Sequence, residues 1–79
     1  MNTFTLYGTQ ACHLCEQAQD MIDHVRTGLD EFRVDIVDIS EAEDLFERYG
    51  IRIPVLRHED QRELDWPFTP DELIAFLRS

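Results

Sequence analysis

The sequence predicts an α/β fold in which strands and helices follow one another in the order β-α-β-α-β-β-α. Three observations lead to this prediction. Strand-like and helix-like hydrophobic periods alternate along the chain, Gly and Pro residues separate them, and a Cys-x-x-C motif stands where the first strand gives way to the first helix. An internal β-α-β unit predicts a parallel strand pair with a right-handed crossover, and a closing hairpin adds antiparallel strands. We therefore expect a four-stranded mixed sheet flanked by three helices.

The first strand and the first helix are predicted from a change of hydrophobic period. Thr3 to Tyr7 alternates β-branched and bulky apolar residues, which is typical of a strand. The segment 12–26 then has apolar residues at helical spacing, which predicts one buried face: Leu14, Ala18, Met21, Ile22 and Val25. Gly28 is expected to stop this helix.

The second strand and the second helix follow directly. Phe32 to Ile39 reads FRVDIVDI, with Phe32, Val34 and Ile36 on one face and Val37 and Ile39 on the other, so both faces should be partly covered. Ser40 and Glu43 have the spacing of a capping box, which predicts a helix start. The short helix should place three side chains inward and end at Gly50: Leu45, Phe46 and Tyr49.

A hairpin and a last helix complete the chain. The segment Ile51 to Leu56 is expected to lead the chain back to the sheet and then form the third strand. Pro54 is placed at the start of this strand because proline has no N–H to donate. Glu59 to Arg62 is a polar turn, and Glu63 to Trp66 is a short fourth strand. The last helix is predicted from an N-terminal capping pattern, Thr69-Pro70-Asp71-Glu72, and from a buried stripe of Leu73, Ile74, Phe76 and Leu77.

The length, composition and charge of the chain limit the classes of function that it can have. The chain has 79 residues, which predicts one domain over 1–79, and its 43% of hydrophobic residues suits a folded globule. Its net charge is −10 and its seven basic residues are all Arg, so we expect no binding to nucleic acid or to an anionic membrane. We find neither a signal-peptide pattern nor a long apolar run, and we expect a cytoplasmic monomer whose cysteines rest mostly reduced.

Cys12 and Cys15 are the only cysteines of the chain. Two residues three positions apart on a helix have Cα atoms about 5 Å apart, within the window of roughly 4.4–6.8 Å that a disulfide needs. A bridge across so short a loop stabilises a fold by only about 2 kcal/mol in the chain-entropy model. The pair is therefore better explained by thiol–disulfide chemistry than by architecture, and no metal site is expected.

Three further side chains are candidates for roles beside the cysteines. A protonated His13 at the helix start would favour the Cys12 thiolate, although an exposed ring turned away is the alternative. Trp66 is expected either to pack in the core or to form a wall of the substrate groove. Tyr7 is expected either to line the site or to pack in the core. His24 and His58 are predicted to be solvated surface residues.

The chain resembles the minimal thioredoxin fold, and in this small version the glutaredoxin-like family of bacteria. The resemblance rests on Cys12-His13-Leu14-Cys15 after the first strand, on Ile53-Pro54-Val55 at the third, and on the spacing of the elements. It implies that Cys12 is the exposed nucleophile and Cys15 the resolving thiol. It also implies a cis Pro54 beside the cysteines, with the backbone of Ile53 pairing with a substrate peptide or with glutathione.

The chain departs from typical glutaredoxins at three places. His13 and Leu14 stand where those proteins have Pro and Tyr, and the neutral segment 9–11 stands where they often carry a basic residue. Leu64-Asp65-Trp66-Pro67-Phe68 stands where they have Gly-Gly and an acidic residue.

The sequence thus predicts a small dithiol thiol–disulfide oxidoreductase, with Cys12 as nucleophile and Cys15 as resolving thiol. Its substrate would be a disulfide-containing protein or a small-molecule thiol compound, with no bound cofactor and with glutathione as a redox co-substrate. Two alternatives remain open. One is a non-catalytic thioredoxin-like module that binds a partner or senses redox state. The other is a metal or cluster site in which Cys12, His13 and Cys15 are completed by a second chain or an external thiol.

Overall fold

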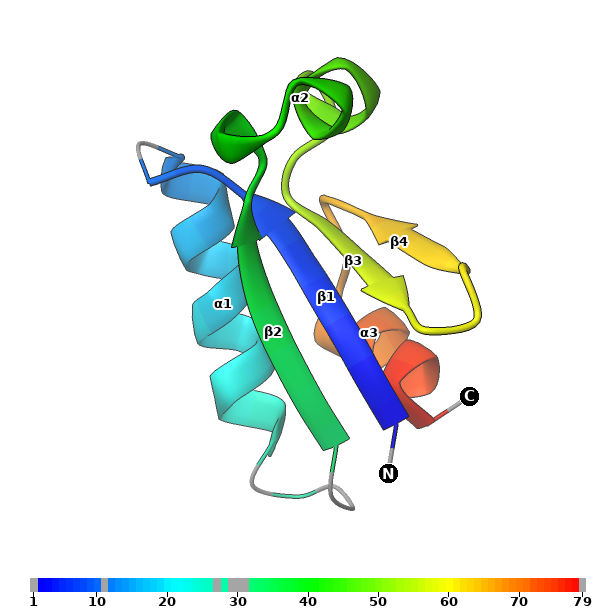
Figure 1. Ribbon diagram of the computed structural model, residues 1–79. Helices are drawn as coiled ribbons and strands as arrows, with labels where there is room; N and C mark the ends of the chain where they lie inside the picture. Colours follow the sequence, from blue (N-terminus) through cyan, green and yellow to red (C-terminus); the bar gives the residue numbers. More distant parts are fainter. Residues whose placement is uncertain (1, 11, 27, 29–31, 79) are drawn as a thin grey trace.

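The computed structural model describes residues 2–10, 12–26, 28 and 32–78. Its elements confirm the predicted order, with a short 3-10 helix added after the second strand (Figure 1). Along the chain they are β1 (Asn2–Gly8), α1 (His13–Arg26), β2 (Phe32–Asp38), the 3-10 helix η1 (Ile39–Glu41), α2 (Glu43–Tyr49), β3 (Val55–His58), β4 (Glu63–Asp65) and α3 (Pro70–Arg78). Within the described part of the chain, no helix has both the length and the apolar character needed to cross a membrane.

The four strands form one mixed sheet in the order β2-β1-β3-β4. β1 pairs with β2 in parallel, and Tyr7 lies opposite Val37. β1 pairs with β3 in antiparallel fashion, and Tyr7 lies opposite Val55. In Figure 1, α1 and α3 lie behind the sheet, and α2 stands at the end toward which β1 and β2 point. The end of β1, the start of α1 and the start of β3 therefore meet at one edge of the molecule.

The larger core lies between the sheet and the two helices α1 and α3. Even-numbered residues of β1 point to this side because successive side chains of a strand alternate between its faces. Burying one such aliphatic or aromatic side chain contributes about 1.5–3 kcal/mol, so this layer is the main source of stability. Its buried members are Phe4, Leu6, Ala18, Ile22, Leu56, Phe68, Leu73 and Leu77.

A smaller core lies on the opposite face of the sheet, under α2. Its buried members are Tyr7, Ile39, Tyr49 and Val55, and the rings of Tyr7 and Tyr49 stack with centroids 4.4 Å apart. Val37 packs against this cluster, whereas Phe32 and Val34 pack against the larger one. The prediction that β2 contributes apolar residues to both faces is therefore confirmed. Ile36 is nevertheless 57% exposed, because β2 is an edge strand.

The predicted start of the second helix is wrong in detail. The Asp38 carboxylate accepts hydrogen bonds from the Ser40 N–H at 2.9 Å and from the Ser40 hydroxyl at 2.7 Å. Ser40 therefore lies in η1 rather than capping a helix, and α2 begins at Glu43 after Ala42. Phe46 was expected to face inward but is 57% exposed, because Leu45 and Tyr49 form the inward stripe of this short helix.

The third strand begins directly after Pro54, as predicted, and the residues before it form the approach. The N–H groups of Arg52 and Ile53 both donate to the Tyr49 carbonyl, at 2.8 and 3.0 Å, so the chain keeps turning after α2 and enters β3 only at Val55. The predicted turn over Glu59–Arg62 is confirmed, with Gln61 at a φ of 81°.

The prediction that His58 is solvated is wrong, because its side chain lies in the larger core. His58 is 7% exposed, and its ring meets that of Phe4 edge to face at 4.8 Å. Strand alternation explains this position, since His58 shares a face of β3 with Leu56 and pairs across with Phe4. Its Nδ1 accepts a hydrogen bond from the Asp60 N–H at 3.0 Å, whereas its buried Nε2 has no hydrogen-bond partner among the described residues.

The predicted cap of α3 is confirmed. The Thr69 hydroxyl accepts from the Glu72 N–H at 3.1 Å, and the Glu72 carboxylate accepts from the Thr69 N–H at 2.9 Å. This reciprocal pair satisfies two donors at the helix start. The helix then buries Leu73 and Leu77, with Ile74 and Phe76 partly buried.

Candidate redox site

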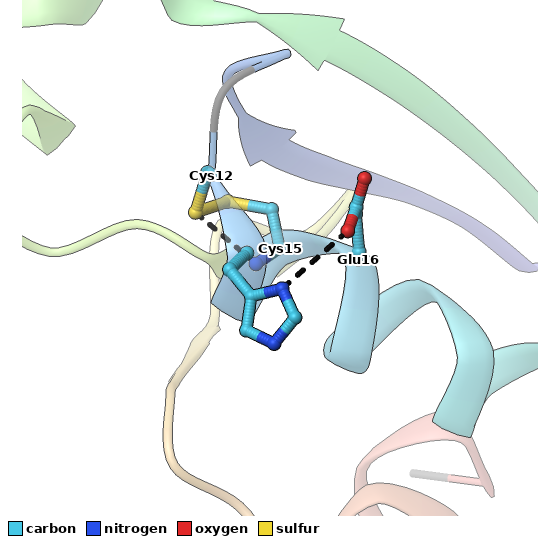
Figure 2. The surroundings of a disulfide bond; sticks show 4 residues. Cys12, Cys15 and Glu16 are labelled. Atoms are coloured by element: carbon cyan, nitrogen blue, oxygen red, sulfur yellow. Dashed lines mark hydrogen bonds and ion pairs between the residues drawn. A yellow bond between two sulfur atoms is a disulfide. The ribbon is translucent and has the colours of Figure 1, made fainter.

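Cys12 and Cys15 are joined by a disulfide at the start of α1 (Figure 2). Their Cα atoms are 5.2 Å apart, as the helical spacing predicts. Cys12 stands just before the helix and is half-buried, whereas Cys15 lies in the first turn and is 8% exposed. Cys12 is therefore the more exposed residue of the pair.

The first turn of α1 directs a backbone donor at the outer sulfur. The Cys15 N–H donates to Cys12 Sγ at 3.1 Å. The first N–H groups of a helix have no partner within the helix, and its N-terminus carries partial positive charge. Both effects favour negative charge on Cys12, so the local structure is suited to holding this residue as a thiolate when the disulfide is reduced.

Gly8, at the end of β1, is fitted closely against the inner cysteine. A Cβ atom built on Gly8 would lie 2.8 Å from Cys15 Sγ and 3.1 Å from Cys15 Cβ. Only a residue without a side chain leaves room for Cys15 at its present position. Sequence reasoning assigned Gly8 no role in the site, because Gly8 and Cys15 lie on different elements and no local pattern relates them.

His13 projects into solvent beside the disulfide and is 81% exposed. Its Nδ1 lies 3.6 Å from Oε2 of Glu16, which stands three residues further along α1. The influence of His13 on Cys12 stays a prediction.

The metal-binding alternative needs free thiolates, because zinc is bound by the cysteine thiolate. In this structure both sulfurs are engaged in the disulfide. Residues 2–10, 12–26, 28 and 32–78 contain no group of three or more His, Cys, Asp or Glu side chains arranged to hold an ion.

Ile53 and Pro54 lie at the start of β3, next to the end of β1. The peptide bond between them is cis, as the resemblance implied. Because Tyr7 lies opposite Val55, Pro54 stands beside the point where the chain leaves β1 toward Cys12. The Ile53 N–H donates to the Tyr49 carbonyl at 3.0 Å, and the Pro54 carbonyl accepts from the Trp66 N–H at 3.2 Å. Two of the backbone groups near the predicted substrate position are thus paired within the fold.

Trp66 and Tyr7 pack in the interior. Trp66 is partly buried, contacts the larger core and meets Phe68 edge to face at 5.0 Å; its bond to Pro67 is also cis. Its predicted role in substrate binding stays a prediction. Tyr7 is 9% exposed and stacks on Tyr49, so it belongs to the smaller core under α2. His24 is exposed, as predicted.

A polar network that sequence reasoning missed links α2 to the hairpin. The Tyr49 hydroxyl donates to Glu63 Oε2 at 2.6 Å, and Arg52 donates to Glu63 Oε1 and to Asp65 Oδ1, both at 2.8 Å. Burial raises the pKa of Glu63, but the hydrogen bonds from Tyr49 and Arg52 outweigh it and hold the pKa below its ordinary value. Burial, followed by the bond to Glu63, raises the pKa of Tyr49.

This network fixes the segment that carries Pro54, since Arg52 precedes the cis bond by one residue and is anchored to β4. Glu63 and Asp65 share a face of β4, but the sequence does not reveal which basic residue meets them.

The comparisons agree with this geometry. The family model described as "Glutaredoxin-like domain (DUF836)" matches residues 3–78. The crystal structure of protein XcR50 from X. campestris shares 41% identity over 95% of this chain and 95% of that one, with a TM-score of 0.79. The solution structure of XcR50 gives a TM-score of 0.78 at 41% identity, covering 99% of this chain and 94% of that one.

A second bacterial relative has the same fold. Protein Ne2328 from Nitrosomonas europaea is 26% identical over 95% of this chain and 89% of its own, with a TM-score of 0.79. No curated protein matches this chain in sequence. The family model covers residues 3–78, a range that includes the Cys-x-x-C pair and the segment before β3, and the match to XcR50 covers 95% of the chain. The chain therefore belongs to the glutaredoxin-like domain family, with a thioredoxin-like fold and a Cys12–Cys15 disulfide at the start of its first helix.

Proposed function

We propose that the protein is a small thiol–disulfide oxidoreductase in which Cys12 is the nucleophile and Cys15 the resolving thiol. One observation carries this proposal: the disulfide lies at the N-terminus of α1, with the Cys15 N–H directed at Cys12 Sγ at 3.1 Å. A thiolate is the attacking species in disulfide exchange, and this position stabilises one on Cys12. The greater burial of Cys15 suits a sulfur that reacts only with its neighbour.

The proposed reaction begins with the reduced pair. The Cys12 thiolate attacks one sulfur of the substrate disulfide, that bond breaks, and the departing substrate thiolate takes a proton from solvent. Cys15 then loses its proton and attacks Cys12 Sγ in the mixed disulfide. The Cys12–Cys15 bond forms as the second substrate thiolate leaves and is protonated. The substrate gains two electrons and two protons in total, and the protein is oxidised.

A thiol reductant closes the proposed cycle. Two molecules of glutathione would reduce the Cys12–Cys15 disulfide and leave as glutathione disulfide, so glutathione is a co-substrate rather than a bound cofactor. The reducing cytoplasm would supply it, and the protein would act as a monomer on a disulfide-containing protein or small molecule.

The proposed substrate contacts are Ile53, Pro54 and Trp66. Because the Ile53 N–H donates to Tyr49, we assign the Ile53 carbonyl as the acceptor for a substrate N–H.

The test compares two serine variants with the parent protein on a neutral disulfide, with glutathione as reductant. Cys12→Ser should abolish reduction, because it removes the attacking sulfur. Cys15→Ser should retain the first step and accumulate a mixed disulfide on Cys12, visible as an added mass. Each variant controls for the other, since both remove one thiol and the ability to form the disulfide.

Full activity of Cys12→Ser would disprove the proposal. If neither thiol of the parent protein exchanges with disulfides, the fold serves as a binding module. Cys15→Ser without an adduct on Cys12 would reassign the two roles.

A further inference from the structure

A groove lies between α1 and the edge strand β2, beside the disulfide. It has a volume of about 510 Å³ and is lined in part by Gly8, Gln19 and the apolar residues Ile36 and Val37. A smaller hollow of about 140 Å³ shares Gln19 and Ile36 with it, so the depression continues along the same edge of the sheet. Its extent suits a stretch of polypeptide, and the exposed Ile36 offers an apolar contact.

Carboxylates from three different elements line this groove. Glu16 comes from α1, Asp38 from the end of β2 and Glu41 from η1, and none of the described lining residues is basic. The hydroxyl and N–H of Ser40 both donate to Asp38 and lower the pKa of its carboxyl, so it is ionised at neutral pH. Arg52, by contrast, is engaged by Glu63 and Asp65 on β4, at the other edge of the sheet. The groove is therefore a region of negative potential within a chain of net charge −10.

The groove borders the redox pair through two lining residues, Gly8 and Glu16, although neither cysteine lines it. Gly8 lines it and abuts Cys15 Sγ, so a methyl group there would stand 2.8 Å from that sulfur. Glu16 also lines it, follows Cys15 directly and donates its N–H to the Cys12 carbonyl at 3.3 Å. Exchange requires a substrate sulfur to reach Cys12 Sγ, and each extended residue spans roughly 3.3–3.6 Å. The substrate residues placed to meet the groove are therefore those that flank the reacting cysteine.

We propose that this groove selects disulfide substrates in which a Lys or Arg residue lies within a few positions of the reacting cysteine. The proposal rests on the oxidoreductase function and names its substrate class as basic polypeptides. The cationic head would pair with the groove carboxylates, and its aliphatic stem would lie along Ile36 and Val37. Opposite charge also speeds diffusional encounter, an effect that salt weakens.

The experiment uses three disulfide peptides of equal length whose flanking residues are Lys, Gln or Glu. Their reduction by the reduced protein is followed by stopped flow at low and at high ionic strength. We expect the Lys peptide to react on the order of tenfold faster than the Glu peptide at low ionic strength, with a smaller ratio at high ionic strength. The Gln peptide has no flanking charge, so its rate shows whether the protein reduces disulfides at all. A failure of the oxidoreductase function can thus be distinguished from a failure of the charge preference.

Matched variants separate the groove from the overall charge. Glu16→Gln and Glu41→Gln remove groove carboxylates, whereas Glu47→Gln and Glu59→Gln change the net charge equally at exposed sites outside it. The Lys-to-Glu rate ratio should fall in the first pair and stay near the parent value in the second. Equal ratios in all four variants would overturn the groove's role. Failure of the parent protein to reduce the Gln peptide would instead contradict the oxidoreductase function.

Discussion

Replacing Gly8 with Ala tests how tightly the end of β1 is fitted to the redox pair. The new methyl group would lie 2.8 Å from Cys15 Sγ and 3.1 Å from Cys15 Cβ, both closer than ordinary packing allows. In the oxidised protein Cys15 Sγ is bonded to Cys12 and cannot rotate away from the new methyl group, and Cys15 itself is buried. In the reduced protein the sulfur is released and can turn about its Cα–Cβ bond. The substitution should therefore destabilise the oxidised state more than the reduced one.

The size of the effect follows from the cost of overpacking. Inserting a methyl group into a well-packed site costs about 1–3 kcal/mol. For a two-electron couple, about 30 mV corresponds to 1.4 kcal/mol. If this cost falls mainly on the oxidised state, the reduction potential should become less negative by roughly 20–60 mV. Thermal unfolding should show the same asymmetry, because the substitution should lower the melting temperature of the oxidised protein more than that of the reduced protein.

The assay equilibrates the parent and the variant with glutathione buffers of graded ratio and counts free thiols by mass after alkylation. Gly28→Ala is the matched control, because the nearest atom to its new methyl group would be the Val25 carbonyl oxygen at 4.0 Å. Its potential should equal that of the parent. A folded Gly8→Ala protein with an unchanged or more negative potential would show that the methyl group does not selectively destabilise the oxidised state. A variant that is unfolded in both redox states would show the same.

Four further predictions concern stability and tuning. Arg52→Ala should lower the free energy of unfolding by about 1.5–3 kcal/mol in denaturant titrations, because it removes charged hydrogen bonds, whereas Arg33→Ala, with its exposed ion pair, should cost about 0–1 kcal/mol. The pKa of Glu63 is lowered from 4.5, so this residue stabilises the fold at neutral pH and loses that contribution as pH falls through its folded-state pKa; Glu63→Gln should flatten the acid limb of a plot of unfolding free energy against pH. Thr69→Ala should cost about 0.5–2 kcal/mol by thermal unfolding, since it removes the cap of α3. His13→Ala should raise the pH at which thiolate absorbance of the reduced protein appears, and an unchanged titration would remove His13 from the mechanism.

Much of the fold follows from patterns that are local in sequence. The strand alternation of Thr3–Tyr7, the helix after Cys12 and the cap at Thr69 each depend on neighbouring residues, and each of these elements is confirmed. Leu14 is the exception on the predicted buried face of the first helix, because it is 45% exposed. The disulfide also follows from local spacing, because a helical turn brings Cys12 and Cys15 together wherever the helix lies.

The errors arise where another contact overrides the pattern used for the prediction, whether that contact is local or distant in sequence. Ser40 has the spacing of a capping box, but the Asp38 carboxylate engages its N–H and hydroxyl first. His58 is polar, yet the register of β1 and β3 places it against Phe4 in the core.

The groove and the fit of Gly8 were likewise invisible in sequence. Gly8 and Cys15 lie on different elements, and only the crossover of the β1-α1-β2 unit brings Glu16 near Asp38 and Glu41. Tertiary placement of this kind is not encoded in any single motif, which is why the groove is found only in the structure.

The central claim is that Cys12 and Cys15 form a working redox couple. The most direct test is the reduction potential of the pair in glutathione buffers, read by mass together with any mixed disulfide on Cys12. We predict a reversible two-electron couple between about −270 and −120 mV, the range of known oxidoreductases, with a glutathione adduct that accumulates in Cys15→Ser. A pair that never exchanges with glutathione, or an adduct found on Cys15 rather than Cys12, would contradict the account.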